Sequence, residues 1–343
     1  MIIKSIKIQN FRCHEDFNFD FKKKTSIIVG ENGSGKTSVL EAIYEALRGK
    51  SFRAVDKDIL KRDTDYYRVE LDFSDGRKTI VIFGNIDGSS ELRKQFLIDG
   101  KKTTRLPKKN SYPVVLFLPD DLHLISSSPT RKRDYFDRVF SELDDTYLNI
   151  LNKYEKSLKQ RNDLLKKYTE DGIEGLRSVI FSWNFMLSKY GVEIRKKRKR
   201  FIDEINNRIT NTYHSIADNN DEVKIIYEMQ GDECSEEEYL KRLENELQRD
   251  LILGHTGFGV HRDNFIFLFN KTDADGSASR GEVRSIILAQ KFIEAELIFN
   301  KTRKKPVVLL DDVFSELDEK RQKSLTQNFK DNQVIITSVE IAK

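Results

Sequence analysis

A glycine-rich run between two apolar segments constrains the fold of this chain more than any other feature. Residues 26–37 read Ser-Ile-Ile-Val-Gly-Glu-Asn-Gly-Ser-Gly-Lys-Thr, which places Gly30 and the triplet Gly35-Lys36-Thr37 at the spacing of a phosphate-binding loop. Glycines let the backbone turn tightly, so that successive N–H groups point inward at the start of a helix and bind anions. The run therefore predicts a strand, a phosphate-binding loop and a helix, in that order.

Both flanks of the loop agree with this interpretation. Residues 26–29 form a short apolar run typical of a strand, and the residues after the loop recur on one helical face, namely Val39, Leu40, Ile43, Ala46 and Leu47. A glycine-rich turn with an unrelated lysine would need neither flank. We expect Lys36 to reach the β- and γ-phosphates of a nucleotide and the Thr37 hydroxyl to bind Mg²⁺.

Composition excludes several classes of protein. Of 343 residues, 34% are charged and 38% are hydrophobic, and a chain of this length favours two domains or one domain with an insertion. No apolar stretch approaches the roughly 20 residues that a membrane-spanning helix needs, and the first residues lack the apolar segment of a signal peptide. We therefore expect a cytoplasmic protein without a membrane partner.

The metal-binding residue types are scattered. The two cysteines, Cys13 and Cys234, lie far apart and lack metal-ligand spacing, and the five histidines form no cluster in the sequence. These residues predict neither a disulfide framework nor a zinc site.

Basic residues occur in runs although the net charge of +4 is modest. The runs lie at residues 22–24, 101–109, 131–133, 195–200 and 301–305. Each run alone is typical of a solvated face or loop, but several on one surface would bind the phosphates of a nucleic acid. The run at 195–200 interrupts an apolar helix face, and we expect it to project into solvent or toward a polyanion.

The hydrophobic pattern divides the chain into strand-rich and helix-rich regions. Alternating or continuous apolar residues predict strands within 6–11, 17–21, 67–73, 79–83, 112–118, 223–229 and 265–269. Amphipathic stripes predict helices across 130–167, 176–190 and 201–213, and a capping box at Ser235 opens a helix that is expected to run to about residue 251. The sequence predicts an α/β protein in which residues 1–125 and 255–343 form a discontinuous head and residues 126–254 form an inserted, mainly helical lobe.

An apolar run far downstream supplies the second half of the predicted site. Residues 307–310 are typical of a buried parallel strand, and this strand ends in Asp311-Asp312. If the strand brings Asp311 beside Thr37, it completes a Mg²⁺ site, and Asp312 can position or activate the attacking water. The alternative is an acidic turn after a core strand.

A short polar turn precedes the next helical pattern. Residues 278–282 read Ala-Ser-Arg-Gly-Glu and come directly before apolar residues at helical spacing in 286–297. Ser279 and the N–H groups around Gly281 are therefore expected at a helix N-terminus, where anions bind. An ordinary helix cap explains the same residues.

Taken in order, these motifs resemble the RecF family of bacterial replication and repair ATPases, whose ABC-type heads are related to SMC heads. The resemblance covers essentially the whole chain, and it rests on Asn10-Phe11-Arg12 and on residues 30–43, 118–122, 128–137, 159–162, 259–263, 279–282 and 310–318. It implies an ABC-type ATPase head with a P-loop in a mixed sheet, interrupted by a mainly helical lobe.

The resemblance also implies the roles of individual residues. ATP and Mg²⁺ are the implied cofactors. Nucleotide contacts are implied for Arg12, Gly30, Glu31, Asn32, Gly33, Ser34, Gly35, Lys36, Thr37 and Ser38, and for Ser279 and Gly281 of a second copy. Metal binding is implied for Thr37 and Asp311, and catalytic roles for Lys36, Asp311, Asp312 and, in trans, Ser279.

The implied function is an ATP-dependent clamp in recombinational gap repair and replication restart. ATP would join two heads into a homodimer on double-stranded DNA near gaps and single-strand/double-strand junctions, and slow, DNA-stimulated hydrolysis would release it. RecR, acting with RecO, is the implied protein partner, RecA loading the outcome, and the nucleoid the place of action. Single-stranded DNA binding and a part in the SOS response belong to the same expectation.

Two departures from the ABC pattern concern sensing of the γ-phosphate. Residues 112–118 contain no glutamine at the usual place, and Ser338-Val339 follow the strand expected at 334–337 instead of a histidine. Three alternatives remain open from the sequence: a transporter-type ABC ATPase, an SMC-like structural protein, and a small-molecule phosphotransferase. The second would need much longer heptad arms, and the third would not need residues 279–282.

Overall fold

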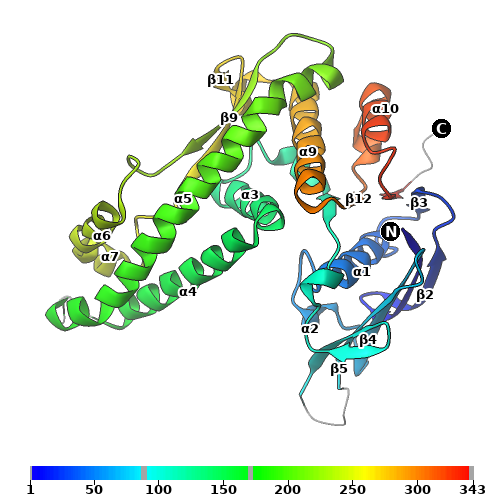
Figure 1. Cartoon of the computed structure of the whole chain (residues 1–343), viewed down its shortest axis with the longest axis horizontal. Coiled ribbons are helices and arrows are strands. Elements are labelled where there is room, and N and C mark those ends of the chain that lie inside the picture. The colour runs from blue at the N-terminus through cyan, green and yellow to red at the C-terminus, as the bar shows by residue number, and fades with distance from the viewer. Residues whose placement is uncertain (1, 86–90, 169–172, 340–343) are drawn as a thin grey trace. The chain divides into compact units, whose positions relative to one another are not determined.

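The computed structural model of the protein describes residues 2–85, 91–168 and 173–339 (Figure 1). The chain forms two compact units. The head unit consists of Met1–Asp121 and Glu294–Lys343, and the helical unit consists of Leu122–Ile293. Residues 255–293, which we expected in the head, thus pack with the helical unit. Their assignment to an ATPase head stays a prediction.

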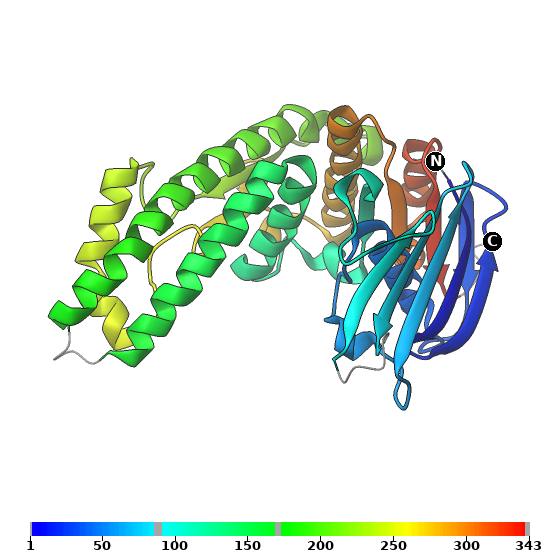
Figure 2. The same cartoon turned by 60° about the horizontal axis from the view of Figure 1, so that its bottom comes forward.

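Two β-sheets form the head unit. The first is antiparallel, has the order β2-β1-β4-β5-β6-β7, and consists of β1 (Ile3–Phe11), β2 (His14–Asp20), β4 (Tyr66–Phe73), β5 (Lys78–Gly84), β6 (Arg93–Ile98) and β7 (Lys101–Thr103) (Figure 2). The second is parallel, has the order β3-β13-β12-β8, and consists of β3 (Thr25–Val29), β8 (Val114–Phe117), β12 (Val307–Asp311) and β13 (Val334–Ser338). This arrangement confirms the expected strands and mixed α/β head, except that β6 and β7 were not predicted.

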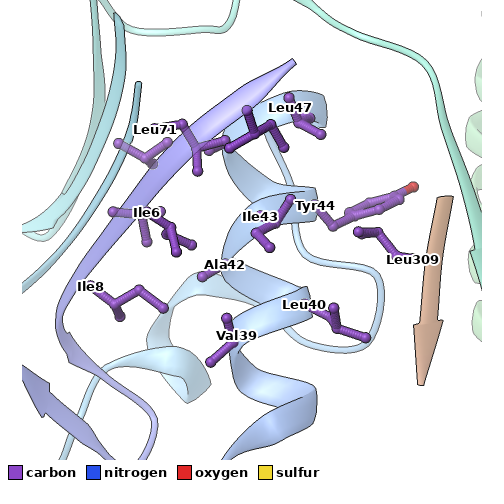
Figure 3. Close-up of a cluster of buried hydrophobic side chains, with 14 of the residues drawn as sticks. Ile6, Ile8, Val39, Leu40, Ala42, Ile43, Tyr44, Leu47, Leu71 and Leu309 are labelled. Atoms are coloured by element: carbon purple, nitrogen blue, oxygen red, sulfur yellow. The ribbon is translucent and has the colours of Figure 1, made fainter. Parts of the chain in front are cut away.

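Helix α1 (Lys36–Arg48) packs against both sheets of the head unit (Figure 3). Its apolar side chains contact Ile6, Ile8 and Leu71 on one side and Leu309 on the other, and all of these residues belong to one buried cluster. Burial of one such aliphatic side chain stabilises a fold by about 1.5–3 kcal/mol. The core of the head unit therefore fixes the helix that follows the glycine-rich loop.

Short elements complete the head unit. They are α2 (Asp56–Ile59), α10 (Glu319–Asn328) and the 3-10 turns Lys108–Asn110 and Phe314–Glu316, and a further 3-10 turn, Pro119–His123, leads into the helical unit.

The helical unit combines long helices with a three-stranded antiparallel sheet. Its helices are α3 (Pro129–Leu143), α4 (Asp145–Lys167), α5 (Ile173–Ala217), α6 (Glu236–Asn245), α7 (Leu247–Leu253) and α8 (Ala274–Ser277). The sheet has the order β11-β10-β9, with β9 (Val223–Glu228), β10 (Asn264–Phe269) and β11 (Thr272–Asp273). Helix α9 (Arg280–Thr302) begins in this unit and ends in the head unit. The full antiparallel pairing of β10 with β9 explains why residues after 255 pack here.

Polar caps set the helix boundaries that the hydrophobic pattern could not. The stripe expected across 130–167 is divided at Asp144, whose side chain accepts hydrogen bonds from the N–H groups of Thr146 and Tyr147 and so begins α4. The capping box at Ser235 is confirmed, since Ser235 Oγ accepts from the Glu238 N–H and the Glu238 carboxylate accepts from the Ser235 N–H. The helix that it opens ends at Asn245, and α7 follows after Glu246.

The expectation that residues 195–200 project as a whole is wrong for two of them. Arg195 and Arg198 are 4% and 1% exposed. Arg195 lies 2.9 Å from an oxygen of Asp263, and Arg198 lies 2.7 Å from an oxygen of Asp137. A run of six basic residues on a helix covers both of its faces, and carboxylates distant in sequence neutralise the two arginines that point inward. Of the rest of the run, Lys196, Lys199 and Arg200 are exposed, whereas Lys197 is partly buried and lies 2.8 Å from Asp144.

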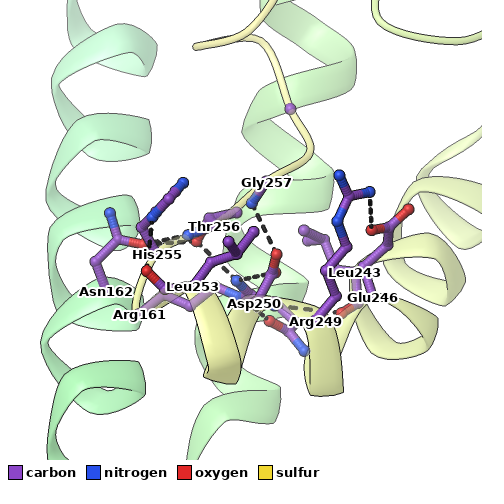
Figure 4. Close-up of polar contacts among 12 residues, drawn as sticks. Arg161, Asn162, Leu243, Glu246, Arg249, Asp250, Leu253, His255, Thr256 and Gly257 are labelled. Atoms are coloured by element: carbon purple, nitrogen blue, oxygen red, sulfur yellow. Dashed lines mark hydrogen bonds and ion pairs between the residues drawn. The ribbon is translucent and has the colours of Figure 1, made fainter.

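Arg161 is the centre of a buried polar network in the helical unit (Figure 4). Its side chain is fully buried and donates to Asn184, Asp250 and Thr256, in each case over 2.7 Å. Asn162 accepts from both the N–H and the hydroxyl of Thr256. The network ties α4 to α5, to α7 and to the loop after α7, so residues 159–162 are not simply an exposed helix face.

Replacing Arg161 with methionine leaves the Asp250 carboxylate buried without its cation. We expect Arg161→Met to lower the free energy of unfolding of the helical unit by about 3–5 kcal/mol, because an uncompensated buried charge costs that much. Urea unfolding measures the loss. The matched variant Arg161→Met/Asp250→Asn keeps an acceptor for the Gly257 N–H and removes the charge, so it should recover part of the stability. A double variant no more stable than the single one would contradict this account.

Candidate functional site

The glycine-rich loop lies at the carboxyl edge of the parallel sheet. It runs from the end of β3 at Val29 to the start of α1 at Lys36, and Gly35 caps the helix with φ at 92°. Because β3, β13 and β12 are parallel neighbours, their carboxyl ends share one edge. The acidic end of β12 is therefore brought to the loop, as the sequence predicted.

Thr37 and Asp311 meet at this edge although they lie 274 residues apart in the sequence. The Thr37 hydroxyl donates to Asp311 Oδ1 over 2.8 Å, and the Thr337 hydroxyl on β13 donates to the same oxygen over 2.8 Å. Burial raises the pKa of Asp311, and the two threonine hydrogen bonds oppose that rise. The pair is thus a compact set of oxygen donors at the start of α1.

These donors fit Mg²⁺. Nucleotide sites hold this ion through one or two protein oxygens together with phosphate oxygens, which complete its octahedral shell. Among residues 2–85, 91–168 and 173–339, no cluster of three or more histidine, cysteine, aspartate or glutamate side chains is placed to hold a metal by itself. The roles of Thr37 and Asp311 as ligands stay predictions.

Lys36 and Asp312 lie beside this pair. Lys36 Nζ donates to the carbonyl oxygens of Gly30 (2.8 Å) and Glu31 (3.0 Å) and lies 3.8 Å from Asp312 Oδ2. Asp312 follows β12 with φ at 49°, a left-handed conformation that costs energy in a residue with a Cβ and is frequent at functional sites. Two of the four predicted catalytic residues, Lys36 and Asp312, therefore lie at the loop beside Asp311, and their roles stay predictions.

The loop also contacts the turn between β1 and β2. A Cβ at Gly35 would overlap Cys13 Sγ and His14 Nε2, whereas a Cβ at Gly33 would meet nothing within 4 Å. His14 Nε2 lies 3.0 Å from the carbonyl oxygen of Gly35. His14 thus belongs to the surroundings of the loop, which its isolated place in the sequence did not indicate.

A buried carboxylate links Arg12 to the first turns of α1. Glu41 is fully buried and accepts from Arg12 Nη2 (2.8 Å) and from Arg53 Nε (2.9 Å). Burial raises the pKa of Glu41, but the hydrogen bonds from both arginines outweigh it, so the net pKa is lowered. Arg53 Nη2 also lies 3.3 Å from the hydroxyl of Ser38. The predicted residues Arg12 and Ser38 thus lie around Glu41.

Sequence reasoning missed Glu41, Arg53 and Thr337 as members of this site. Arg53 and Glu41 belong to no motif with an evident mechanism. Thr337 carried a signal, because it is a polar residue at the end of an apolar run, and its register partner in β12 is Asp311.

The predicted turn at Ser279 is a helix cap in the helical unit. Ser279 Oγ accepts from the Glu282 N–H (3.3 Å), and the Glu282 carboxylate accepts from the Ser279 N–H (2.6 Å). Gly281 lies in the first turn of α9. The contacts of Ser279 are those of an ordinary helix cap. A role of Ser279 and Gly281 in binding nucleotide stays a prediction.

His261 is held by hydrogen bonds within the helical unit. Its Nδ1 lies 2.8 Å from the Tyr154 hydroxyl, and its Nε2 lies 3.0 Å from the carbonyl oxygen of Thr256. Burial lowers the pKa of His261 to about 4. The neutral ring donates to Thr256 and accepts from Tyr154, which is the behaviour of a structural histidine.

Comparison with known proteins decides the family. The family model described as "AAA ATPase domain" matches residues 1–332. The chain is 33% identical over 348 residues to the DNA replication and repair protein RecF of Lachnoclostridium phytofermentans, an alignment that covers 98% of this chain and 92% of that protein. The chain belongs to the RecF family. The RecF of Lachnospira eligens is 34% identical over 342 residues, again with 98% and 92% covered.

Solved structures agree with the RecF assignment. The structure described as the recombination mediator protein RecF-ATP in the RecFOR pathway has a TM-score of 0.85 and 30% identity, and the match covers 100% of this chain and 93% of that one. An Smc head bound to the C-winged helix domain of ScpA has a TM-score of 0.51 and 15% identity, covering 99% and 90%, which shows a shared fold alone. The expected ABC-type head fold of RecF and SMC proteins is thus confirmed.

Family membership makes this chain a DNA replication and repair protein of the RecF type with a nucleotide-binding ATPase domain. In the part of the chain that the structure describes, no helix is long and apolar enough to cross a membrane.

Alanine substitutions at Gly33 and Gly35 distinguish the effect of backbone strain in the loop from the effect of steric overlap. Gly33 and Gly35 both have positive φ, at 82° and 92°, so alanine is strained at either position by about 1 kcal/mol. Only Gly35→Ala adds an overlap with Cys13 and His14. We expect Gly35→Ala to weaken ATP binding by more than about tenfold and Gly33→Ala by less, as measured with a fluorescent ATP analogue. Equal losses would show that contact with the β1–β2 turn does not shape the loop.

The depressed pKa of His261 predicts a loss of stability in mild acid. The unfolded imidazole has a pKa near 6.5, so between about pH 6.5 and pH 4 the unfolded chain binds more protons and the stability falls as the pH falls. The full loss in the free energy of unfolding, once the pH is below both pKa values, is on the order of 3 kcal/mol. Urea unfolding from pH 7.5 to 4.5 should show this decrease in the free energy of unfolding in the wild type and not in His261→Gln. The control variant His123→Gln, at an exposed position, should retain the decrease. A decrease of the same size in His261→Gln would assign the pH dependence to other groups.

Proposed function

We propose that this protein is an ATP-driven DNA clamp of recombinational gap repair and replication restart. In this proposal ATP binding joins two heads on double-stranded DNA, and hydrolysis separates them. The observation that carries the proposal is the contact between Thr37 and Asp311, because it assembles the two halves of an ATPase site. RecF membership supplies the biological setting.

Within one chain, the loop residues bind and orient the nucleotide. The N–H groups of residues 30–38 hold the phosphates at the start of α1, and Lys36 exchanges its carbonyl partners for phosphate oxygens. Bound Mg²⁺, held by Thr37 and Asp311, would neutralise phosphate charge. Asp312 positions the attacking water, and its carboxylate is held near Lys36. Glu41 keeps Arg12 and Arg53 beside the same helix.

A second copy of the chain completes the site in this proposal. Ser279 and Gly281 of that copy cover the nucleotide from the start of α9, where N–H groups and the helix dipole favour an anion. The γ-phosphate then contacts both chains, and its loss removes contacts that exist only in the dimer. A ligand shifts an equilibrium through such differential contacts.

Exposed basic residues support a DNA partner. Lys196, Lys199 and Arg200 are exposed on α5, where Lys199 lies 2.9 Å from Glu233 and Arg200 lies 3.8 Å from Asp144, so phosphates would compete with these surface carboxylates. Charges of this kind bind phosphates without reading bases, so we propose that the clamp holds double-stranded DNA near gaps and junctions with little sequence preference. The solved relative is described as part of the RecFOR pathway, which supports RecR, acting with RecO, as the partner and RecA loading as the outcome.

Hydrolysis is expected to be slow and DNA-stimulated. Ser338, the last residue of β13, and Val339 stand where ABC proteins usually place a histidine, and β8 carries no glutamine. With those γ-phosphate sensors absent from these two strands, the energy of ATP binding serves mainly to set how long the heads stay joined.

ATP-dependent dimerisation tests the shared site. In sedimentation velocity with Mg²⁺ and saturating ATP, Asp312→Asn should bind ATP, turn it over slowly and sediment as a dimer. Adding Ser279→Arg should return it to the monomer while ATP affinity changes by less than about threefold, because Ser279 acts only in trans. Ser277→Arg, an exposed position in α8, is the matched control and should leave the dimer intact. An Asp312→Asn protein that stays monomeric with ATP bound would overturn the shared-site proposal.

A further inference from the structure

A basic pocket lies at the amino edge of the parallel sheet, the edge opposite the glycine-rich loop. Its volume is about 520 Å³, and it lies wholly within the head unit. The side chains that the following argument uses belong to Lys24, Tyr112, Arg303, Lys304, Lys305 and Gln333.

The parallel register explains why these residues meet. Lys24 directly precedes β3, Gln333 directly precedes β13, and residues 303–305 lead into β12. Since these strands are parallel, their first residues share one edge. The Gln333 amide accepts from the Ile3 N–H (2.7 Å) and donates to the Ile3 carbonyl oxygen (2.8 Å), so it fixes the pocket wall to the antiparallel sheet. The pocket is part of the framework of the head unit.

Positive charge exceeds negative charge around the pocket. Five basic side chains line it against two carboxylates, and both carboxylates are paired, Asp75 with Arg77 at 2.6 Å and Asp331 with Lys305 at 3.1 Å. Within the described part of the chain, Lys24, Arg303 and Lys304 have no carboxylate oxygen within 4 Å. Three cations are therefore available to an anionic ligand.

The floor of the pocket is apolar. Ile2, Tyr112 and Val307 line it, and Tyr112 is 7% exposed. Lys304 Nζ lies 5.8 Å from the centroid of the Tyr112 ring. A ligand that fits this pocket thus carries negative charges beside an apolar group.

Arg303 occupies a backbone position that favours glycine. It follows the last turn of α9 with φ at 56°, and its N–H donates to the Phe299 carbonyl oxygen, so it closes the helix in the left-handed conformation. Glycine ends helices there without strain. The Arg303 side chain lines the pocket, and a role for it there would offset the backbone strain.

We propose that this pocket binds an acidic peptide segment of a partner protein, with an apolar side chain of the peptide on Tyr112. The backbone phosphates of a DNA duplex could contact these cations, but they would leave the apolar floor of Ile2, Tyr112 and Val307 uncovered. A free polyphosphate would pair with the cations and leave the apolar floor uncovered. Arg77 and Lys305 already pair with Asp75 and Asp331, so a peptide carboxylate would pair with Lys24, Arg303 or Lys304. The proposal does not rest on the nucleotide site.

Fluorescence anisotropy with a labelled peptide tests the pocket. The probe is a run of aspartates followed by phenylalanine, and it should bind saturably at low salt and more weakly as salt rises. Arg303→Gly relieves the strained backbone while it removes the charge, so it should weaken binding about tenfold with an unchanged or higher melting temperature. Lys24→Glu should weaken binding at least as much. Lys323→Glu, an exposed position on α10 outside the pocket, is the matched control and should change affinity by less than about twofold.

The same experiment distinguishes other ligands. A probe without phenylalanine should bind about tenfold more weakly, because the apolar floor stays uncovered. Absence of saturable binding, or equal affinities for wild type and Arg303→Gly, would overturn the proposal. Competition by tripolyphosphate that is as strong as competition by the unlabelled peptide would assign the pocket to a phosphate ligand. Loss of duplex DNA affinity in Arg303→Gly without loss of peptide affinity would assign it to DNA. ATP binding by the variants stays as in the wild type in all cases.

Discussion

The parallel register of β3, β13 and β12 is the constraint on which the rest of the head unit depends. Val29 pairs with Ser338, and Thr337 pairs with Asp311, so the end of the strand before the loop and the acidic end of β12 reach the same edge. A slip by one residue would turn Asp311 to the other face of the sheet, because side chains alternate along a strand. The contact between Thr37 and Asp311 is therefore a consequence of the register. The amino ends of the same strands, at the opposite edge, gather the basic residues of the pocket.

Buried pairs of arginine or lysine with carboxylates join elements that lie far apart in the sequence in both units. On α1, Glu41 holds Arg12 and Arg53, and Glu45, also fully buried, lies 2.5 Å from Lys94 of β6. In the helical unit, Arg161, Arg195 and Arg198 serve the same purpose. A buried pair contributes little net stability against an apolar replacement, but removing one partner is costly. These pairs therefore act chiefly by specifying how the helices, strands and loops within each unit meet.

Local patterns predicted the elements whose structure depends on near neighbours. The glycine-rich loop, α1, β12 and the Ser235 cap were all evident from the order and spacing of residues. Features that depend on distant partners were not. Nothing near Arg195 or Arg198 indicates the carboxylates that bury them, and the polar start of β6 hides a strand that is stabilised by pairing with β5. Residues 255–293 were assigned to the head because their sequence returns to a strand-like pattern. Their packing is set instead by β9 and the helices around it. The sequence therefore predicted the residues of the candidate site that belong to recognisable motifs. It did not predict Glu41, Arg53 and Thr337, which belong to no such motif.

The proposed dimer site combines the loop site of one head with the start of α9 from the second copy, and these two parts differ in how far they are prepared for nucleotide. The head half is assembled, with Thr37, Asp311 and Lys36 already at the loop. The α9 half is capped by its own side chains, since the Glu282 carboxylate accepts from the Ser279 N–H over 2.6 Å. These two reciprocal bonds take up the N–H groups of Ser279 and Glu282 and place a negative charge at the start of the helix, where it repels a second anion. Closure of two heads on a nucleotide would therefore require Glu282 to release Ser279. In the proposed clamp this exchange would belong to dimer closure, whereas Thr37, Asp311 and Lys36 already lie at the loop of the single head.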